Sequence, residues 1–187
     1  VDLNSNSQTA PRSNKAPFMN SHPFSSILLG STHPLPFQGH FRVRIGTPKC
    51  HADIAGRIAH EVSPEKSWAH ATILHQTLIE AKGEDALSLI RDCWNRLLTL
   101  PRQKISPQKG QDLSLLICAQ DDEISAISSV GLSGIWEDTG AENLQVIADE
   151  QTEESSHKGI PQKAPKVLTL PLKPRVFLAT CLGEALE

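Results

Sequence analysis

The sequence predicts an α+β fold in which helices are segregated from a mostly antiparallel set of strands. Two observations carry this prediction. Helical periodicity is confined to the middle of the chain, from about residue 51 to Pro101. Short apolar runs with the alternation of strands lie on both sides of that block. We therefore expect a β-sandwich flanked by long helices.

The N-terminal part is expected to contain a leader and two strands. Residues 1–24 are rich in Asn, Ser and Pro, and such a segment buries too little apolar surface to offset the cost of ordering it. We therefore expect a flexible leader over 1–24 and a single domain over 25–187. The first strand candidate is SSILLG, residues 25–30. The second is FRVRI, residues 41–45, in which apolar residues alternate with arginines.

The central block is expected to be helical. In CHADIAGRIAHEV, residues 50–62, apolar residues recur at helical spacing. Ser63-Pro64 is expected to end this helix, because a residue before proline disfavours the helical region. Two further apolar stripes follow, one starting at Trp68 and one running from Ala86 to Pro101. They predict two long helices, or one helix broken at Lys82-Gly83.

The remaining elements are expected to be strands. LSLLICAQ and EISAISSV are expected to pair as a hairpin across Asp121-Asp122, because Asp-rich turns are ordinary hairpin connections. Further strand candidates are GIWE (134–137), LQVIA (144–148), KVLTLPL (166–172) and RVFLATC (175–181). CLGEALE, residues 181–187, has the pattern of a helix start.

Composition excludes several classes of function. A net charge of -3 and a pI of about 6.2 argue against a surface for nucleic acid or an anionic membrane, which needs a basic excess. No window approaches the roughly 20 apolar residues that span a bilayer, and no secretory signal is apparent. The spacings of Cys50, Cys93, Cys118 and Cys181 match no zinc motif. Cys93 and Cys118 are expected in the core, and the protein in a reducing, intracellular compartment, the cytoplasm.

The histidines and cysteines do not predict a metal site. Cys50, His51 and His60 are close in sequence, but nine positions put the two histidines on opposite faces of a helix. His51 is expected to be a partly buried residue of the first helical turn. His75 is expected between helix and sheet, and His70 on a different face of the helix.

Ser133 lies in GLSG, residues 131–134, which invites comparison with a nucleophile elbow. The second glycine comes one residue too early for that motif, and the flanking pattern is strand into strand. We expect a turn serine at a corner between strands. Trp68, Trp94 and Trp136 are expected in the core or at its rim.

Four segments, in order, resemble the metal-dependent protein phosphatases of the PPM, or PP2C-like, family. FRVRIGTPK with ADIAGRIA resembles the family's strand ending in Asp-Gly-His-Gly-Gly and its following helix. Two long helices follow, as in the family. GQDLSLLICAQDDEISAISSVGLSGIW resembles the threonine-rich strand and the hairpin ending in Gly-Asp-Ser-Arg. LKPRVFLATCLGEAL resembles the strand ending in Ser/Thr-Asp-Gly and its helix. The likeness spans residues 26–187.

The resemblance implies a degenerate metal centre. In the family, aspartates at strand ends hold two manganese or magnesium ions, which activate water and neutralise charge. Here Ile45 takes the place of the first aspartate, with Gly46 kept after it, and Leu132 takes that of the second. Cys181 or Leu182, depending on a one-residue shift, takes that of the third. Isoleucine and leucine offer no lone pair to a cation.

The resemblance therefore implies a pseudophosphatase with no catalytic residue, no metal and no cofactor, which binds or regulates a protein partner. The family's late Asp-Asn segment has no counterpart before Glu187, so we expect the sandwich to be truncated at its C-terminal side. The exposed sheet edge left by that truncation leads us to expect a homodimer or a strand supplied by a partner.

Two alternatives stay open. The first is a divergent, active Ser/Thr phosphatase that uses manganese or magnesium and draws ligands from Asp53, Asp112, Asp121 or Asp138. The second is an unrelated α+β structural module.

Overall fold

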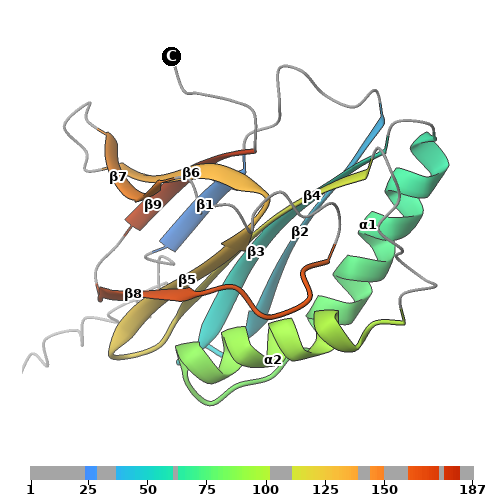
Figure 1. Ribbon diagram of the computed structural model, residues 1–187. Coiled ribbons are helices and arrows are strands. Elements are labelled where there is room, and N and C mark those ends of the chain that lie inside the picture. Colours follow the sequence, from blue (N-terminus) through green and yellow to red (C-terminus); the bar gives the residue numbers. More distant parts are fainter. Residues whose placement is uncertain are drawn as a thin grey trace, which may run out of the picture.

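The computed structural model describes residues 24–28, 37–60, 63–101, 111–138, 144–149, 160–172 and 175–181. The central layer is a five-stranded antiparallel sheet in the order β2-β3-β4-β5-β8 (Figure 1). Its strands are β2 (Phe37–Gly46), β3 (His51–His60), β4 (Gln111–Gln120), β5 (Ile124–Val130) and β8 (Val167–Pro171). Strands β2, β3 and β4 are each ten residues long and pair without a register shift.

A second, four-stranded sheet lies on one side of the first. Its order is β1-β9-β6-β7, with β1 and β9 parallel and the other pairs antiparallel. The strands are β1 (Phe24–Leu28), β9 (Arg175–Cys181), β6 (Leu132–Asp138) and β7 (Leu144–Asp149). Phe24, the last residue of the expected leader, begins β1; the rest of that leader lies outside the described residues.

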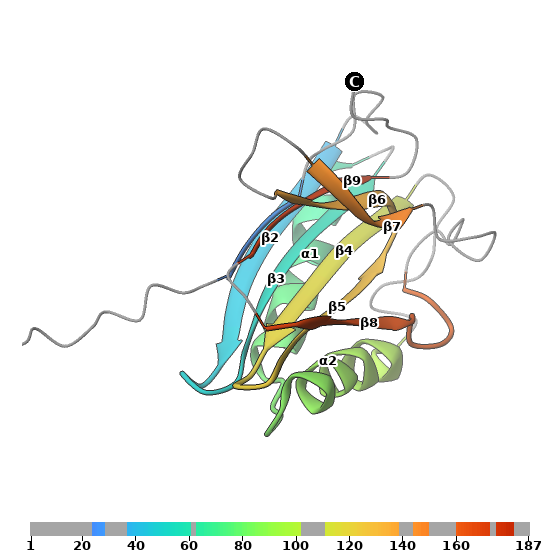
Figure 2. The same ribbon diagram turned by 90° about the vertical axis from the view of Figure 1, so that its left-hand side faces the viewer.

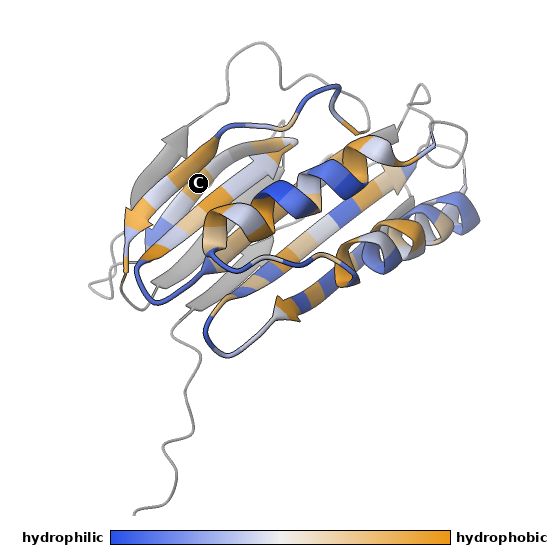
Figure 3. Cartoon of the chain, turned by 90° about the horizontal axis from the view of Figure 1, so that it is seen from below, coloured by the Kyte–Doolittle hydropathy of each residue, from blue (hydrophilic) through white to orange (hydrophobic). Residues whose placement is uncertain are grey.

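Two helices cover the opposite face of the five-stranded sheet. They are α1 (Pro64–Ile79) and α2 (Ala86–Thr99). Figure 2 shows the five-stranded sheet with α1 behind it and β6, β7 and β9 in front. Both helices carry hydrophobic and hydrophilic residues (Figure 3). The predicted α+β class and the predicted flanking helices are therefore confirmed.

The larger hydrophobic core lies between the helices and the five-stranded sheet. Trp94, on α2, is 1% exposed, and its indole nitrogen donates to Ser128 Oγ on β5 at 2.9 Å. This bond satisfies the polar atom of a buried tryptophan. Other members of the core include Ile54, Ile58, Leu74, Leu78, Leu89, Ile90, Cys93, Leu97, Leu115 and Ile117.

The helix predicted over residues 50–62 is wrong, because His51–His60 form strand β3. Every residue of β3 is buried. A strand covered on both faces reads as a near-continuous apolar run, which periodicity cannot tell from a buried helix. Ser63-Pro64 does not end a helix there but begins α1. The Ser63 hydroxyl accepts a hydrogen bond from the Lys66 amide, and Pro64 is the first helical residue.

Three smaller predictions can now be judged. His51 is buried, as a residue at the start of β3 rather than in a helical turn. Trp94 lies in the core as expected, but Trp68 is 55% exposed on α1, so the core or rim position predicted for it is wrong. The helix start expected after Cys181 lies outside the described residues.

The corner between the two sheets is built on Gly131, between β5 and β6. Its backbone has φ +68, and a β-carbon there would collide with the Leu113 carbonyl. The expectation that GLSG forms a corner between strands is confirmed. Glycine is required on two counts, because it tolerates the left-handed region and has no side chain to clash.

We predict that Gly131→Ala lowers the free energy of unfolding by about 1–3 kcal/mol, measured by urea denaturation. Gly131→Asn is the matched variant, because asparagine tolerates positive φ better than alanine does. An equal cost for both variants would assign the effect to the Leu113 carbonyl, and a smaller cost for asparagine would assign it to the backbone. Parent-like stability of both variants would contradict the prediction.

Candidate functional site

The candidate site is the inner face of the five-stranded sheet, defined here as the face turned towards the second sheet. Ile54 and Ile58 of β3 belong to the core under the helices. Alternation along a strand therefore puts Asp53, Ala55 and Arg57 on the inner face. Part of the inner face is apolar, where Leu116, Cys118, Ile127, Leu132 and Ile135 pack together. The part formed by β2 and β3 is charged.

Arg44 and Asp53 form an ion pair across β2 and β3. The two residues are cross-strand partners, and Arg44 Nε donates to Asp53 Oδ1 at 2.8 Å while Nη2 donates to Oδ2. The Asp53 side chain is 2% exposed and the Arg44 side chain 35% exposed. The hydrogen bond with Asp53 raises the pKa of the Arg44 guanidinium. Both oxygens of Asp53 are thus occupied by a bidentate arginine.

We predict an asymmetry between the two ends of this pair. Arg44→Met leaves a buried carboxylate without its cation and should cost about 3 kcal/mol or more of unfolding free energy. Asp53→Asn leaves a half-exposed guanidinium that water can reach and should cost about 1 kcal/mol. Urea denaturation at neutral pH measures both, with exposed Arg42→Met on the same strand as control. Equal costs for the two variants would contradict the prediction.

Arg57 is the second charge that the strand brings to the inner face. It is 3% exposed, and its cross-strand neighbours are His40 on β2 and Ser114 on β4. Burial, and next the positive charge of Arg57, lower the pKa of His40. His40 is therefore neutral over a wider pH range than a free imidazole. The positive charge of this cross-strand pair is carried by the guanidinium of Arg57.

Asp121 serves the fold rather than an open site. One oxygen accepts the amides of Glu123 and Ile124 at 2.8 and 2.9 Å, closing the β4–β5 hairpin. The other accepts the amide of Ala86, the first residue of α2, at 2.8 Å. Burial raises the pKa of Asp121, but the three backbone hydrogen bonds outweigh it, and the pKa is lowered. The predicted role of Asp121 in the hairpin turn is confirmed.

The structure brings some of the predicted site positions together and keeps others apart. Leu132 and Cys181 are cross-strand partners of β6 and β9, and Leu132 lies in the inner apolar cluster. Ile45 belongs instead to the core under the helices, and Gly46 follows it at φ +99. Leu182 lies outside the described residues.

The separation of Ile45 from Leu132 can be estimated from the register. Ile45 pairs with Ala52, which pairs with Ala119, so Ile45 and Ala119 lie level with each other across the sheet. The corner before Leu132 lies against Leu113. Six positions along β4 correspond to about 20 Å. The helix expected directly after Ile45-Gly46 is absent, and the strand that leads into α1 is β3, which ends at His60.

The aspartates proposed for an active alternative do not converge. Asp53 pairs with Cys118, and Asp112, six positions before Cys118 on β4, pairs with Ala59. The two aspartates are therefore about 20 Å apart along the strands. Asp138 ends β6, where it pairs with Leu144. Among the described residues, no group of three or more His, Cys, Asp or Glu side chains could hold a metal ion. The residues described do not fit the two-metal centre of the PP2C-like family.

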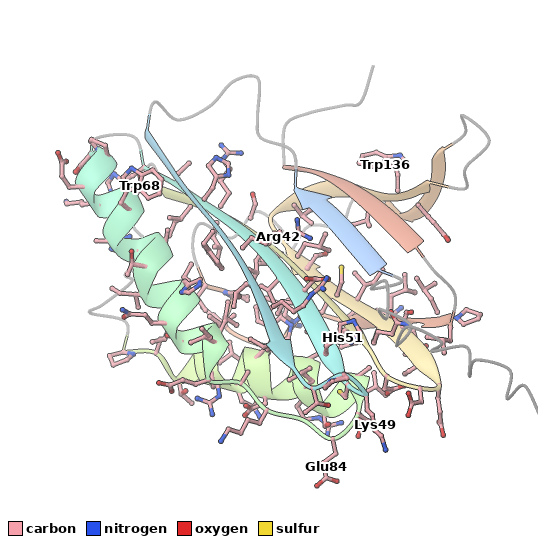
Figure 4. The ribbon with its side chains drawn as sticks, turned by 180° about the vertical axis from the view of Figure 1, so that it is seen from behind. Arg42, Lys49, His51, Trp68, Glu84 and Trp136 are labelled. Carbon is pink, nitrogen blue, oxygen red and sulfur yellow. The ribbon has the colours of Figure 1, made fainter. Side chains whose placement is uncertain are left out.

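The histidine and cysteine candidates are also dispersed. Cys50 and His51 lie at one end of β3 and His60 at the other. Figure 4 shows His51 near Lys49, at the end of the sheet away from Trp68. Burial raises the pKa of Cys50 to about 11 and that of Cys93 to about 12, which leaves both thiols protonated and poorly reactive. Ser133 is the second residue of β6, just past the corner.

A pair of histidines joins the end of β3 to α1. The rings of His60 and His70 lie 6.4 Å apart, and His60 is 2% exposed. Nδ1 of His70 is buried and has no hydrogen-bond partner in the described part of the chain. Burial, and next the charges of His60 and Lys66, lower the pKa of His70. His75 packs edge-on against Phe41 between α1 and the sheet, as predicted.

We predict that stability falls as the pH drops below the ordinary histidine value of 6.5. A histidine with a lowered pKa in the folded state takes up its proton more readily when unfolded. Its contribution is therefore complete above pH 6.5 and is lost towards the folded pKa. Urea denaturation between pH 7.5 and 5 measures this loss, and His70→Gln should flatten the curve. An unchanged slope in the variant would contradict the prediction.

Sequence reasoning missed the residues that give the inner face its charge. Arg57 is missed because its segment is predicted to be a helix, and His40 because it lies just before the predicted strand 41–45. The alternation of His40, Arg42 and Arg44 on β2 was a usable signal, because an edge strand with positive residues on one side predicts a charged face.

Similarity to known proteins is found among solved structures only. No protein-family model and no curated protein sequence matches the chain. Among solved structures, the SiaA-PP2C domain of Pseudomonas aeruginosa is 12% identical, with a TM-score of 0.47. The match covers 75% of this chain and 54% of that one, so the chain spans about half its length.

Two further structures have the same character. A serine/threonine phosphatase of S. agalactiae is 18% identical, with a TM-score of 0.47 and coverage of 72% of this chain and 68% of that chain. The PP2C phosphatase domain of SpoIIE from Bacillus subtilis is 16% identical, with a TM-score of 0.41 and coverage of 73% and 38%. By their descriptions these three proteins are PP2C-type or serine/threonine phosphatases. Within the described residues, no helix is long and apolar enough to cross a membrane.

Proposed function

We propose that this chain is a pseudophosphatase, a PP2C-like domain that acts by binding or regulating a protein partner. The observation that carries the proposal is that two of its carboxylates are already hydrogen-bonded to other groups of the protein. Asp53 is held by both nitrogens of an arginine fork, and Asp121 by three backbone amides. A divalent cation would have to displace those partners, and it would meet Arg44 directly beside Asp53.

An exposed stripe on α1 supports the partner-binding part of the proposal. Trp68 is 55% exposed and Ile79 53% exposed. Eleven residues are close to three helical turns, so both side chains lie on one side of α1, about 16 Å apart. Tryptophan is enriched among residues that dominate binding energy. The buried, free thiols of Cys50, Cys93 and Cys118 support the proposed reducing, intracellular location.

The test is a calorimetric titration of manganese into chelator-treated protein, followed by turnover of p-nitrophenyl phosphate in the same sample. We expect no saturable heat and no turnover above buffer, because the inner face of β2 and β3 offers a cation no free carboxylate. An active phosphatase of the same fold serves as positive control.

Saturable binding with turnover that a chelator abolishes would overturn the proposal. In that case the single variants Asp53→Asn, Asp112→Asn and Asp138→Asn would identify the ligands of the active alternative.

A further inference from the structure

Helix α1 presents an exposed face that carries no charge. Residues 67–79, SWAHATILHQTLI, contain no Asp, Glu, Lys or Arg over about three and a half helical turns. The exposed residues of this stretch recur at the three- and four-residue spacing of one helix face, at Trp68, Thr72, Gln76 and Ile79. A helix that covers a sheet normally turns charged residues towards the solvent.

This lack of charge is typical of the centre of a protein interface, where charged residues are depleted and tryptophan is enriched. Trp68 and Ile79 are the two most exposed large apolar side chains in the described part of the chain. The exposed face of α2, by comparison, carries Arg91. Figure 4 shows α1 along one margin of the molecule, beside β2. The charges at the two ends of α1 indicate which partner fits it.

The two ends of this face carry opposite charges. Lys66 precedes the uncharged stretch and Glu80 follows it, and both residues are exposed. Fourteen residues put their side chains within about 40° of each other around the helix. Trp68 and Ile79, eleven residues apart, lie within about 20° of each other. The face therefore has one apolar flank, and a second flank with a positive charge at one end and a negative charge at the other.

A second copy in the antiparallel orientation matches both flanks at once. A two-fold axis level with the midpoint between Trp68 and Ile79 puts each of them opposite the other in the partner subunit. The same axis brings Lys66 level with Glu80 of the partner subunit to within one residue, about 1.5 Å. Glu80 also contacts Arg96 of α2 at 3.2 Å, but its side chain is 71% exposed, so a second cation can reach it.

We propose that α1 is a dimerisation surface, packed antiparallel against α1 of a second copy. Each dimer then contains two contacts between Trp68 and Ile79 and two ion pairs between Lys66 and Glu80. A face about 24 Å long and 10 Å wide is smaller than the roughly 800 Å² per partner of a stable interface, so the dimer dissociates on dilution. The homodimer expected from the sequence uses a sheet edge, whereas this one uses the helix layer. That α1 binds a partner rests on the proposed function, and that the partner is a second copy is the further step.

The first experiment is sedimentation velocity over a hundredfold range of protein concentration. We expect the parent to shift from monomer to dimer as the concentration rises. Trp68→Ala should weaken the dimer at least tenfold, because each dimer loses two contacts of an exposed tryptophan. Leu87→Ala, at an exposed apolar position of α2, is the matched control and should associate like the parent.

An exchange of charges tests the antiparallel register. Lys66→Glu and Glu80→Lys each put like charges opposite one another twice in the dimer, so each variant alone should associate about tenfold more weakly. An equimolar mixture of the two variants restores opposite charges in both pairs and should associate like the parent. Arg91→Glu on α2 is the matched charge control and should leave the association unchanged.

A parent that stays monomeric at every concentration would overturn the proposal and leave α1 to a different protein. A dimer that Trp68→Ala does not weaken would overturn it too, because the contact would lie elsewhere, for example at a sheet edge. A mixture that associates no better than the single variants would overturn the antiparallel register. These outcomes are independent of the manganese test: a monomer that binds no manganese keeps the proposed lack of catalysis and loses the second copy as partner.

Discussion

The fold depends on the double burial of β3. All ten residues of this strand are buried, with helices on one face and the second sheet on the other. The face under the helices meets this constraint mainly with isoleucine and alanine, which need no partner, and with His60 beside His70 of α1. The inner face carries Asp53 and Arg57, and each of these needs a counter-charge. The edge strand β2 supplies Arg44 for Asp53. The chemistry of the inner face therefore depends largely on which residues lie opposite Asp53 and Arg57 of β3.

Much of the architecture could be predicted from the sequence, for identifiable reasons. The β4–β5 hairpin was readable because two apolar runs flank an aspartate pair, and Asp121 closes the turn as expected. Both long helices could be predicted from the helical spacing of their apolar residues. GLSG was recognisable as a corner, although the sequence did not indicate that the corner joins two different sheets. That depends on which strand Gly131 packs against, a long-range contact with Leu113.

The candidate site was much less predictable, and the cause is again β3. A strand buried on both faces has no period-two alternation of polarity, and in HADIAGRIAH the apolar residues also fit a helix. A helix at that segment makes Ile45-Gly46 the end of a strand that precedes a helix. In the structure it leads into a turn and a second strand. The ion pair between Arg44 and Asp53 follows from the register of the β2–β3 hairpin, which the sequence does not predict.

The charges on β2 and β3 also bear on what kind of ion the inner face attracts. On this face Arg42 and Arg44 of β2 and Arg57 of β3 lie beside Asp53 of β3, and Asp112 of β4 is a diagonal neighbour of Arg57. A positive potential repels a divalent cation and attracts an anion. In a centre of the PP2C-like kind, carboxylates hold metals and the metals hold the phosphate. Here Asp53 is held by Arg44 instead, so an arginine occupies the carboxylate oxygens that a metal would need.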